Sequence, residues 1–135
     1  RIRWPEDDSL GPANGGGFHA VIPLVYQREN NYLDVKGFLG SVDILKTIAI
    51  RRILLDNVTH ITAYWATSTL SLALVAQDFG ADDLDGTIEN ESIQSSAGAG
   101  SKKGQSKRDF IDMIGTAGFV PVERDSLYNQ IEIYE

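Results

Sequence analysis

The chain has 135 residues, of which 42% are hydrophobic and 23% charged, the composition of one ordinary globular domain. Its formal net charge of −7 argues against a nucleic-acid partner, because phosphate binding needs clustered positive charge. No apolar run approaches the ~20 residues of a membrane-spanning helix, and no charged start followed by an apolar segment marks a signal peptide. We therefore expect a cytoplasmic protein with no membrane partner.

The chain contains no cysteine. It therefore supplies no thiolate for a disulfide, a zinc ion or an iron–sulfur cluster, and we expect no metal and no cofactor to bind this chain alone. The sequence opens at Arg1 with a polar, turn-rich stretch that runs to Asn14. This opening leads us to expect that the chain continues a longer polypeptide.

The first predicted element is a strand at residues 18–26, an apolar run that follows a glycine turn. A run without polar alternation indicates a parallel strand that is buried on both faces. Pro23 has no N–H to donate, so it should stand at the end of this strand or at an irregular point. A loop is expected at residues 27–40.

A helix is predicted next, from Ser41 to about Asn57. Ser41 offers an N-cap oxygen, Asp43 places a negative charge in the first turn, and apolar residues recur at helical spacing. Residues 60–66 are rich in β-branched and aromatic side chains and predict the second strand. A second helix, at residues 69–79, should follow.

Gly80 is placed to end that helix as a left-handed cap. Residues 82–87 predict a short third strand that opens into a polar loop. Ser106 and Asp109 form a capping box at the start of a helix over residues 106–117. Gly118 should end this helix, and residues 119–135 form a tail of extended character.

Strands that alternate with helices predict right-handed βαβ units in a parallel sheet, which is an α/β fold. Three parallel strands cannot cover their own edges, because such a sheet must be buried on both faces. The pattern therefore suits part of a (β/α) barrel better than a complete fold. We expect residues 1–118 to form the βα units and residues 119–135 to form a C-terminal extension.

Residues 83–87 read Asp-Leu-Asp-Gly-Thr, which resembles the signature of haloacid-dehalogenase-like phosphatases. In that reaction Asp83 would be the nucleophile and Asp85 the general acid. The phosphatase motif normally ends an apolar strand near the start of its domain, whereas here only 48 residues follow it. We therefore predict no phosphoryl chemistry, and keep as alternatives this phosphatase and a non-catalytic α/β module that binds a partner through its sheet edges.

Two histidines and two aromatic residues are further candidates. His19 and His60 each stand alone, which favours structural hydrogen bonding over a role as catalytic base or metal ligand. Tyr64 and Trp65 end the second predicted strand, and in a parallel barrel that end faces the active site. Packing in the core is an equally good interpretation of both aromatic residues.

Six further segments occur in a fixed order along the chain, at residues 17–24, 47–57, 60–65, 79–87, 97–99 and 121–129. Together they resemble the aminofutalosine synthase family, radical S-adenosylmethionine enzymes of menaquinone biosynthesis. The relatives dehypoxanthine futalosine cyclase and the tyrosine-using subunit of deazaflavin (FO) synthase resemble the chain less.

The resemblance implies that the chain is the C-terminal part of a radical S-adenosylmethionine barrel with about three parallel strands and a C-terminal extension. In this family a four-iron four-sulfur cluster, held by an upstream three-cysteine loop, cleaves S-adenosylmethionine. The resulting 5′-deoxyadenosyl radical adds to 3-[(1-carboxyvinyl)oxy]benzoate to give aminofutalosine. Because this chain lacks the cysteines, we expect it to be inactive alone and to need the N-terminal portion of the barrel as a partner.

The resemblance also implies positions for the site. Ile22, Pro23 and Leu24 are expected against the adenine of S-adenosylmethionine. The small-molecule substrate is expected to contact Tyr26, Arg28, Trp65, Asp85 and Thr87. No catalytic residue is assigned, and Tyr26-Gln27-Arg28 departs from the Phe-His-Pro of many members. Open strand edges lead us to expect that the chain self-associates, by strand pairing or by exchange of its tail.

Overall fold

The computed structural model describes residues 18–26, 32–33, 35–37, 39–86 and 105–135. The chain forms two compact units: residues 1–85 with 92–101, and residues 86–91 with 102–135. The division expected at residue 118 stays a prediction. The elements are β1 (Ala20–Val21), α1 (Ser41–Leu54), β2 (His60–Ile61), α2 (Trp65–Ser68), α3 (Leu70–Val75), η3 (Ala76–Phe79), α5 (Lys107–Thr116), β3 (Val122–Arg124) and β4 (Gln130–Ile133).

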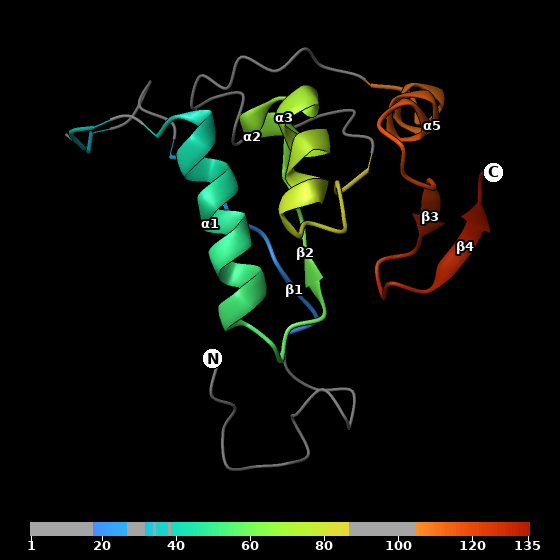
Figure 1. Cartoon of the computed structure of the whole chain (residues 1–135), viewed down its shortest axis with the longest axis horizontal. Helices are drawn as coiled ribbons and strands as arrows, with labels where there is room; N and C mark the ends of the chain where they lie inside the picture. The colour runs from blue at the N-terminus through green and yellow to red at the C-terminus, as the bar shows by residue number, and fades with distance from the viewer. Residues whose placement is uncertain (1–17, 27–31, 34, 38, 87–104) are drawn as a thin grey trace. The chain divides into compact units, whose positions relative to one another are not determined.

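In the first unit β1 and β2 pair in parallel, with Ala20 opposite His60. The amide of Thr62 continues this ladder by donating to the carbonyl of Val21 at 3.0 Å. A parallel bridge then joins Thr62 to Asp83. The parallel orientation predicted for all three segments is confirmed, and the mixture of helices and parallel pairs is that of an α/β protein (Figure 1).

The first strand is shorter and more exposed than predicted. Only Ala20–Val21 of the predicted residues 18–26 pairs, and Pro23 follows the paired residues, as its missing donor requires. Burial on both faces is wrong: the exposed fractions are 43% for Ile22 and 59% for Leu24. Within the described residues β1 has a pairing partner on one side only, so its side chains lack the cover that a central strand receives.

The second strand ends earlier than predicted. Residues 60–66 were expected to be extended, but Trp65 already begins the short helix α2. The carbonyl of Tyr64 accepts from the amide of Ser68 at 3.3 Å and from its hydroxyl at 3.0 Å. These local hydroxyl contacts stabilise a turn at a sequence whose β-branched and aromatic residues favour a strand.

The third strand is reduced to a single bridging residue, Asp83. Asp85 and Gly86 have φ angles of +64° and +70°, which end any extended conformation at once. Of the predicted residues 82–87, Thr87 lies outside the described part of the chain.

Helix α1 begins one residue away from its predicted cap. Gly40, not Ser41, is the N-cap, because the carboxylate of Asp43 accepts from the amide of Gly40 at 3.1 Å. This contact satisfies the amide of the N-cap residue, whereas a serine hydroxyl at the cap would accept from an amide of the first helical turn. The helix ends at Leu54 rather than near Asn57. At this end the amide of Leu55 donates to the carbonyl of Arg51 at 2.8 Å.

The helix predicted at residues 69–79 forms two consecutive pieces, α3 and the 3-10 helix η3. The hydroxyl of Thr69 accepts from the amide of Leu72 at 3.3 Å and caps α3. Gly80 then ends η3 with a φ of +100°. The predicted left-handed glycine cap is therefore confirmed.

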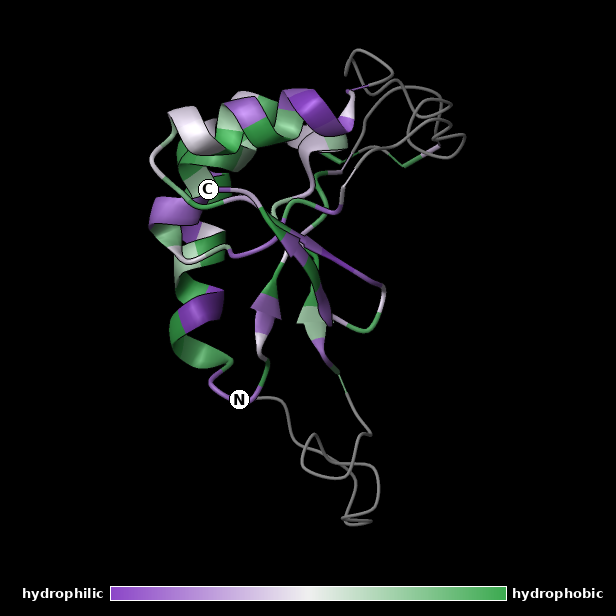
Figure 2. Cartoon of the chain, turned by 90° about the vertical axis from the view of Figure 1, so that its right-hand side faces the viewer, coloured by the Kyte–Doolittle hydropathy of each residue, from purple (hydrophilic) through white to green (hydrophobic). Residues whose placement is uncertain are grey.

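Helices α1 and α3 lie on the same face of β1 and β2 (Figure 2). The core between these layers is made of small and medium apolar side chains from both elements. It contains Ile48, Val58, Ile61, Ala63, Leu70, Ala73, Leu74 and Ala76, each at most 8% exposed. None of the helices in the described residues is long and apolar enough to cross a membrane.

In the second unit the predicted capping box is confirmed. The amide of Ser106 donates to the carboxylate of Asp109 at 2.8 Å, and the amide of Asp109 donates back to the Ser106 hydroxyl. The hydroxyl of Ser106, followed by its amide, lowers the pKa of Asp109. Gly118, with a φ of +88°, follows the helix as predicted.

The tail has the extended character that the sequence predicts, as two paired strands. Residues 119–135 fold back on themselves as an antiparallel hairpin of β3 and β4. Lys107 of α5 ties the helix to this hairpin: its ammonium lies 2.7 Å from the Glu123 carboxylate and 5.2 Å from the centre of the Tyr134 ring. The Tyr134 hydroxyl donates to Glu123 at 3.0 Å, so one face of the hairpin is polar and joined to α5.

Candidate functional site at the carboxyl edge of the sheet

The carboxyl ends of the parallel segments lie at one edge of the sheet, since β1, β2 and Asp83 pair in parallel. Ligands of parallel α/β folds bind at this edge. Three short segments follow the paired residues there: residues 22–26, residues 63–65 and residues 84–86. These segments contain six of the eight predicted contact residues.

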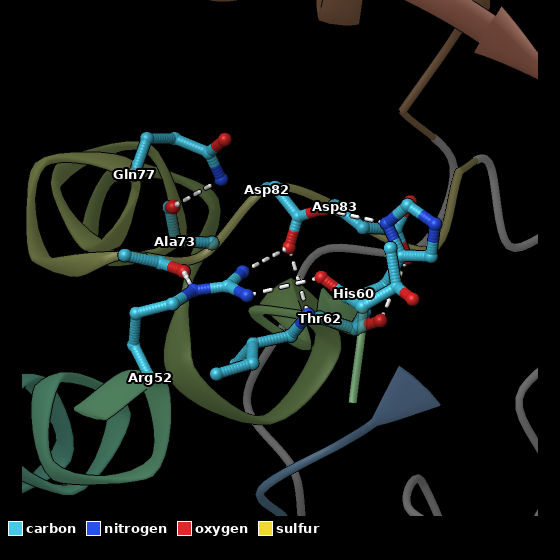
Figure 3. A network of polar contacts seen from close by, with 10 residues as sticks. Arg52, His60, Thr62, Ala73, Gln77, Asp82 and Asp83 are labelled. Carbon is cyan, nitrogen blue, oxygen red and sulfur yellow. Dashed lines mark hydrogen bonds and ion pairs between the residues drawn. The ribbon is translucent and has the colours of Figure 1, made fainter. Parts of the chain in front are cut away.

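Behind this edge, Arg52 of α1 joins three parts of the chain (Figure 3). Its Nε donates to the carbonyl of Gly80 at 2.7 Å, and its Nη1 to the carbonyl of Thr59 at 3.0 Å. Its Nη2 donates to Asp82 Oδ1 at 2.6 Å. A planar guanidinium suits three acceptors in fixed directions, so Arg52 fixes the start of β2 against the turn after η3.

Asp82 is the acceptor at the centre of this network. Besides Arg52, its Oδ1 accepts from the amide of Ile61 at 2.7 Å, and its Oδ2 lies 2.6 Å from His60 Nδ1. This contact of His60, the first residue of β2, with Asp82 supports a structural role for the histidine. His19 contributes its carbonyl, which accepts from the amide of His60 at 3.1 Å.

Gly80 allows the arginine to approach this closely. A Cβ at this position would lie 2.9 Å from Cβ and Cγ of Arg52, closer than side-chain carbons pack. The positive φ of Gly80 is a second reason for glycine. The contact of Arg52 with the turn therefore depends on both residues.

Thr62 and Asp83 form a second polar pair, next to the first and nearer the carboxyl edge. The hydroxyl of Thr62 donates to Asp83 Oδ2 at 2.7 Å, and the amide of Ala63 donates to the carbonyl of Asp83 at 2.8 Å. The Thr62 side chain is completely buried. A buried hydroxyl needs such a partner, because leaving it unsatisfied costs about 1 to 3 kcal/mol.

The positions expected near S-adenosylmethionine lie directly after β1. Ile22 and Leu24 are exposed and Pro23 is half-buried, so they present apolar surface at the carboxyl edge. The Tyr26 hydroxyl donates to the carbonyl of Leu33 at 2.9 Å, and this side chain is 37% exposed. None of these placements tests the roles predicted for Ile22, Pro23, Leu24 and Tyr26, which stay predictions.

The remaining substrate positions differ in exposure. Trp65 is 3% exposed and belongs to the core of this chain. Asp85 is exposed at the left-handed turn. Arg28 and Thr87 lie outside the described residues.

The surroundings of Asp83 and Asp85 differ from the expected context of a phosphatase nucleophile. The 3-10 helix η3 and Gly80 precede them, where that family has an apolar strand. Among the described residues no group of three or more His, Asp or Glu side chains is placed to hold a metal ion.

The Arg52–Asp82–His60 network was not predicted as a unit. The spacing of four residues places Arg52 on the same side of the helix as Ile48, and Asp82 stands in a stretch of several acidic residues. An arginine at an inward position is the signal that could have indicated an ion pair, because a charge there needs a partner. Its partner follows 30 residues later, and only the fold identifies it.

A model of the CofH/MqnC C-terminal region matches residues 15–135. The chain therefore belongs to this family, and the resemblance drawn from the sequence segments is confirmed.

Three curated relatives illustrate the range of the family. The aminodeoxyfutalosine synthase of Thermus thermophilus is 41% identical, over 100% of this chain and 36% of that protein. The cyclic dehypoxanthine futalosine synthase of Streptomyces coelicolor is 38% identical, over 89% and 30% respectively. The 5-amino-6-(D-ribitylamino)uracil–L-tyrosine 4-hydroxyphenyl transferase of Archaeoglobus fulgidus is 41% identical, over 87% and 35%. The chain spans about a third of the length of these relatives.

Proposed function

We propose that this chain is the C-terminal part of a radical S-adenosylmethionine enzyme that makes aminofutalosine for menaquinone biosynthesis. The whole enzyme would add a 5′-deoxyadenosyl radical to the enol-ether double bond of 3-[(1-carboxyvinyl)oxy]benzoate. The observation that carries the proposal is the 41% identity to an aminodeoxyfutalosine synthase over the whole chain. The parallel pairing of β1, β2 and Asp83 supports the barrel fold that this chemistry uses.

The cluster of such an enzyme does not fit this chain. A four-iron four-sulfur cluster is held by cysteine thiolates, and none of the 135 residues is a cysteine. The ligands must therefore come from the N-terminal region of the enzyme. We propose that the 135-residue chain by itself has no activity.

S-adenosylmethionine fits better, because the carboxyl edge offers apolar surface to an adenine ring. In the proposed enzyme Ile22, Pro23 and Leu24 would pack against that ring and exclude water from it. Bound S-adenosylmethionine would supply the radical when the cluster held by the N-terminal region gives it one electron, and the protein would orient it.

The substrate would lie beside the adenosyl group, against the segments that follow β2 and Asp83. Tyr26, Asp85 and Thr87 are the proposed contacts, and Trp65, which is 3% exposed, would support this surface from the core. Arg28 would bind a substrate carboxylate through charge-assisted hydrogen bonds. The hydrogen bond from the Ala63 amide to the Asp83 carbonyl supports this proposal, because it fixes the backbone directly before the turn at Asp85.

The test uses a fusion of this chain to the N-terminal region of the Thermus thermophilus relative. After anaerobic reconstitution with iron and sulfide, the fusion receives S-adenosylmethionine, a reductant and 3-[(1-carboxyvinyl)oxy]benzoate. Aminofutalosine is the expected product by mass spectrometry. The chain alone, treated identically, should give neither product nor the visible absorption of a cluster.

Substrate choice decides between the family members. The same fusion is offered dehypoxanthine futalosine, and separately tyrosine with 5-amino-6-(D-ribitylamino)uracil. Turnover of either one, without turnover of the benzoate, would contradict the proposed reaction and leave the family assignment in place. Matched Arg28→Lys and Arg28→Gln variants then test the carboxylate contact. Loss of the positive charge should raise KM more in the glutamine variant than in the lysine variant.

A further inference from the structure

Exposed apolar side chains gather at the carboxyl edge, in the segment that follows β1 and in the loop after it. The members of this group are each 37% to 68% exposed: Ile22, Leu24, Tyr26, Leu33 and Val35. Single exposed apolar residues are ordinary on a protein surface, whereas a cluster of them marks a place where something binds. We call these five residues the edge cluster.

Tyr26 joins the two parts of the edge cluster. Its hydroxyl donates to the carbonyl of Leu33 at 2.9 Å, and the amide of Val35 donates to the same carbonyl at 2.9 Å. A carbonyl oxygen has two lone pairs, so both are engaged. Leu33 is therefore held beside the segment that follows β1, while its side chain stays 68% exposed.

This contact commits the proton of the Tyr26 hydroxyl. A phenol has one O–H to donate, and here the Leu33 carbonyl accepts it. The carboxylates of the proposed substrate are acceptors only, so the Tyr26 hydroxyl cannot donate to them while it holds Leu33. Tyr26 then meets a substrate through its ring. The edge cluster thus suits the apolar part of a ligand.

We propose that Leu33 is a specificity-determining residue that packs against the aromatic ring of the substrate, and that Tyr26 is the positioning residue that holds it there. The inference rests on the proposed function, in which Ile22 and Leu24 face the adenine. Ligand sites are lined mainly by apolar side chains, and a few polar groups fix the orientation. An aromatic ring is the largest apolar part of the proposed substrate, and Leu33 is the most exposed member of the edge cluster.

A thiol at position 33 tests this contact without catalysis, because the chain has no cysteine of its own. Leu33→Cys keeps the backbone carbonyl that Tyr26 holds. Val42→Cys places a control thiol on α1 at a position of similar exposure, 62% against 68%. Both variants are made in the fusion to the N-terminal region of the Thermus thermophilus relative, with S-adenosylmethionine present and no reductant.

The rate of maleimide labelling is measured with and without 3-[(1-carboxyvinyl)oxy]benzoate, at a concentration that equilibrium dialysis shows to be saturating. Peptide-resolved mass spectrometry separates the new thiols from those of the N-terminal region. We expect the benzoate to slow labelling of the Leu33→Cys thiol about tenfold, because a site buries most of its ligand. Labelling of the Val42→Cys thiol should not change. Adding Tyr26→Phe to Leu33→Cys should remove the protection.

Two results would overturn the proposal. The first is a Leu33→Cys thiol that reacts equally fast with and without bound benzoate. The second is a Leu33→Cys thiol that the fusion protects without any substrate, because the N-terminal region would then cover this position.

Steady-state kinetics of the fusion separate this role from a merely structural one. Leu33→Ala should raise KM for the benzoate about tenfold and change kcat little, as the loss of an apolar contact does. Leu33→Met should restore KM. Tyr26→Phe should raise KM without lowering the melting temperature. The matched control is Tyr32→Phe, because Tyr32 is fully exposed and its variant should keep KM unchanged.

The double variant tests whether Tyr26 acts through Leu33. Tyr26→Phe combined with Leu33→Ala should be no worse than Leu33→Ala alone, since the hydroxyl then has no side chain left to position. Additive increases in KM would contradict the positioning role.

Failure of this inference and failure of the proposed function give different results. Suppose that tyrosine with 5-amino-6-(D-ribitylamino)uracil protects the Leu33→Cys thiol and the benzoate does not. The contact with an aromatic ring then stands, and the proposed reaction is contradicted. Turnover of the benzoate to aminofutalosine without protection of this thiol does the reverse.

Discussion

The guanidinium of Arg52 and the carboxylate of Asp82 meet at 2.6 Å, although 30 residues separate them in the chain. Arg52 comes from the last turn of α1, and Asp82 follows the turn that ends η3. The ion pair thus connects the last turn of α1 to the segment that follows Gly80, next to the start of β2. It lies behind the carboxyl edge, so we assign it to stability rather than to ligand binding.

Arg52→Met should lower the free energy of unfolding by about 1 to 2 kcal/mol, because hydrogen bonds to charged groups are lost while the site stays partly hydrated. Arg52→Lys should restore little of this, since an ammonium cannot reach three acceptors in fixed directions. Urea unfolding measures both. Arg108→Met is the matched control: Arg108 is 80% exposed in a pair with Asp112 and should cost less than about 0.5 kcal/mol. Equal losses at the two arginines would contradict the assignment.

Gly80→Ala and Gly118→Ala form a second matched pair. Both glycines have positive φ, +100° and +88°, and alanine should cost about 1 kcal/mol or more at each for that reason alone. Only at Gly80 would the new methyl lie 2.9 Å from Arg52 carbons, whereas Gly118 has open space. We therefore expect the larger loss of thermal stability at Gly80. Similar melting temperatures for the two variants would show that the turn moves freely away from Arg52.

Thr62→Val replaces a buried hydroxyl by a methyl of similar shape. The Asp83 carboxylate then loses a donor at 2.7 Å, and we expect a loss of about 1 to 2 kcal/mol in unfolding free energy. Thr62→Ser keeps the donor and serves as the control. A double-mutant cycle with Asp83→Asn should give a coupling of at least about 0.5 kcal/mol. Additive losses would mean that the two side chains do not interact.

The hairpin unit should have a stability plateau between mildly acidic and alkaline pH. Lys107 donates to Glu123 and lowers its pKa, with a further contribution from Tyr134. A lowered pKa stabilises the fold above the ordinary glutamate value, and this stabilisation is lost as the pH falls through the folded-state value. The same hydrogen bond to Glu123 raises the pKa of Lys107; that contribution is present below the ordinary lysine value and is lost at higher pH.

Amide hydrogen exchange of β3 and β4, corrected for the intrinsic dependence of exchange on pH, measures the acid limb of this profile. Lys107→Met should weaken the acid limb that comes from Glu123. Arg108→Met, one residue along the same helix, should leave it unchanged. An acid limb that survives in Lys107→Met would show that the ion pair does not stabilise the hairpin.

Self-association remains a prediction, with one change in its basis. The tail pairs with itself as β3 and β4, so the open edge of β1 is the surface that we expect to drive it. Light scattering during size-exclusion chromatography over a tenfold concentration range measures it. A constant mass near 14.8 kDa would contradict the prediction.

Short-range features were accessible from the sequence. The capping box of Ser106 and Asp109, the left-handed cap at Gly80 and the helix in the segment after Ser41 each depend on contacts within a few residues. Parallel pairing followed from the alternation of strands and helices, because a crossover of that length returns the chain in the same direction. The family was accessible for a different reason, since six short segments in fixed order are specific even where each is not.

Features that depend on distant residues were decided by the tertiary structure alone. How far β1 extends depends on whether a neighbouring strand is present, and its apolar sequence is the same in either case. Trp65 begins a helix because Ser68 satisfies the carbonyl before it, against the strand preference of the segment. The side chains of Arg52 and Asp82 come within hydrogen-bonding distance only when α1 and η3 pack together. A sequence pattern encodes local preference and the apolar face, whereas pairing partners and ion pairs follow from which surfaces meet.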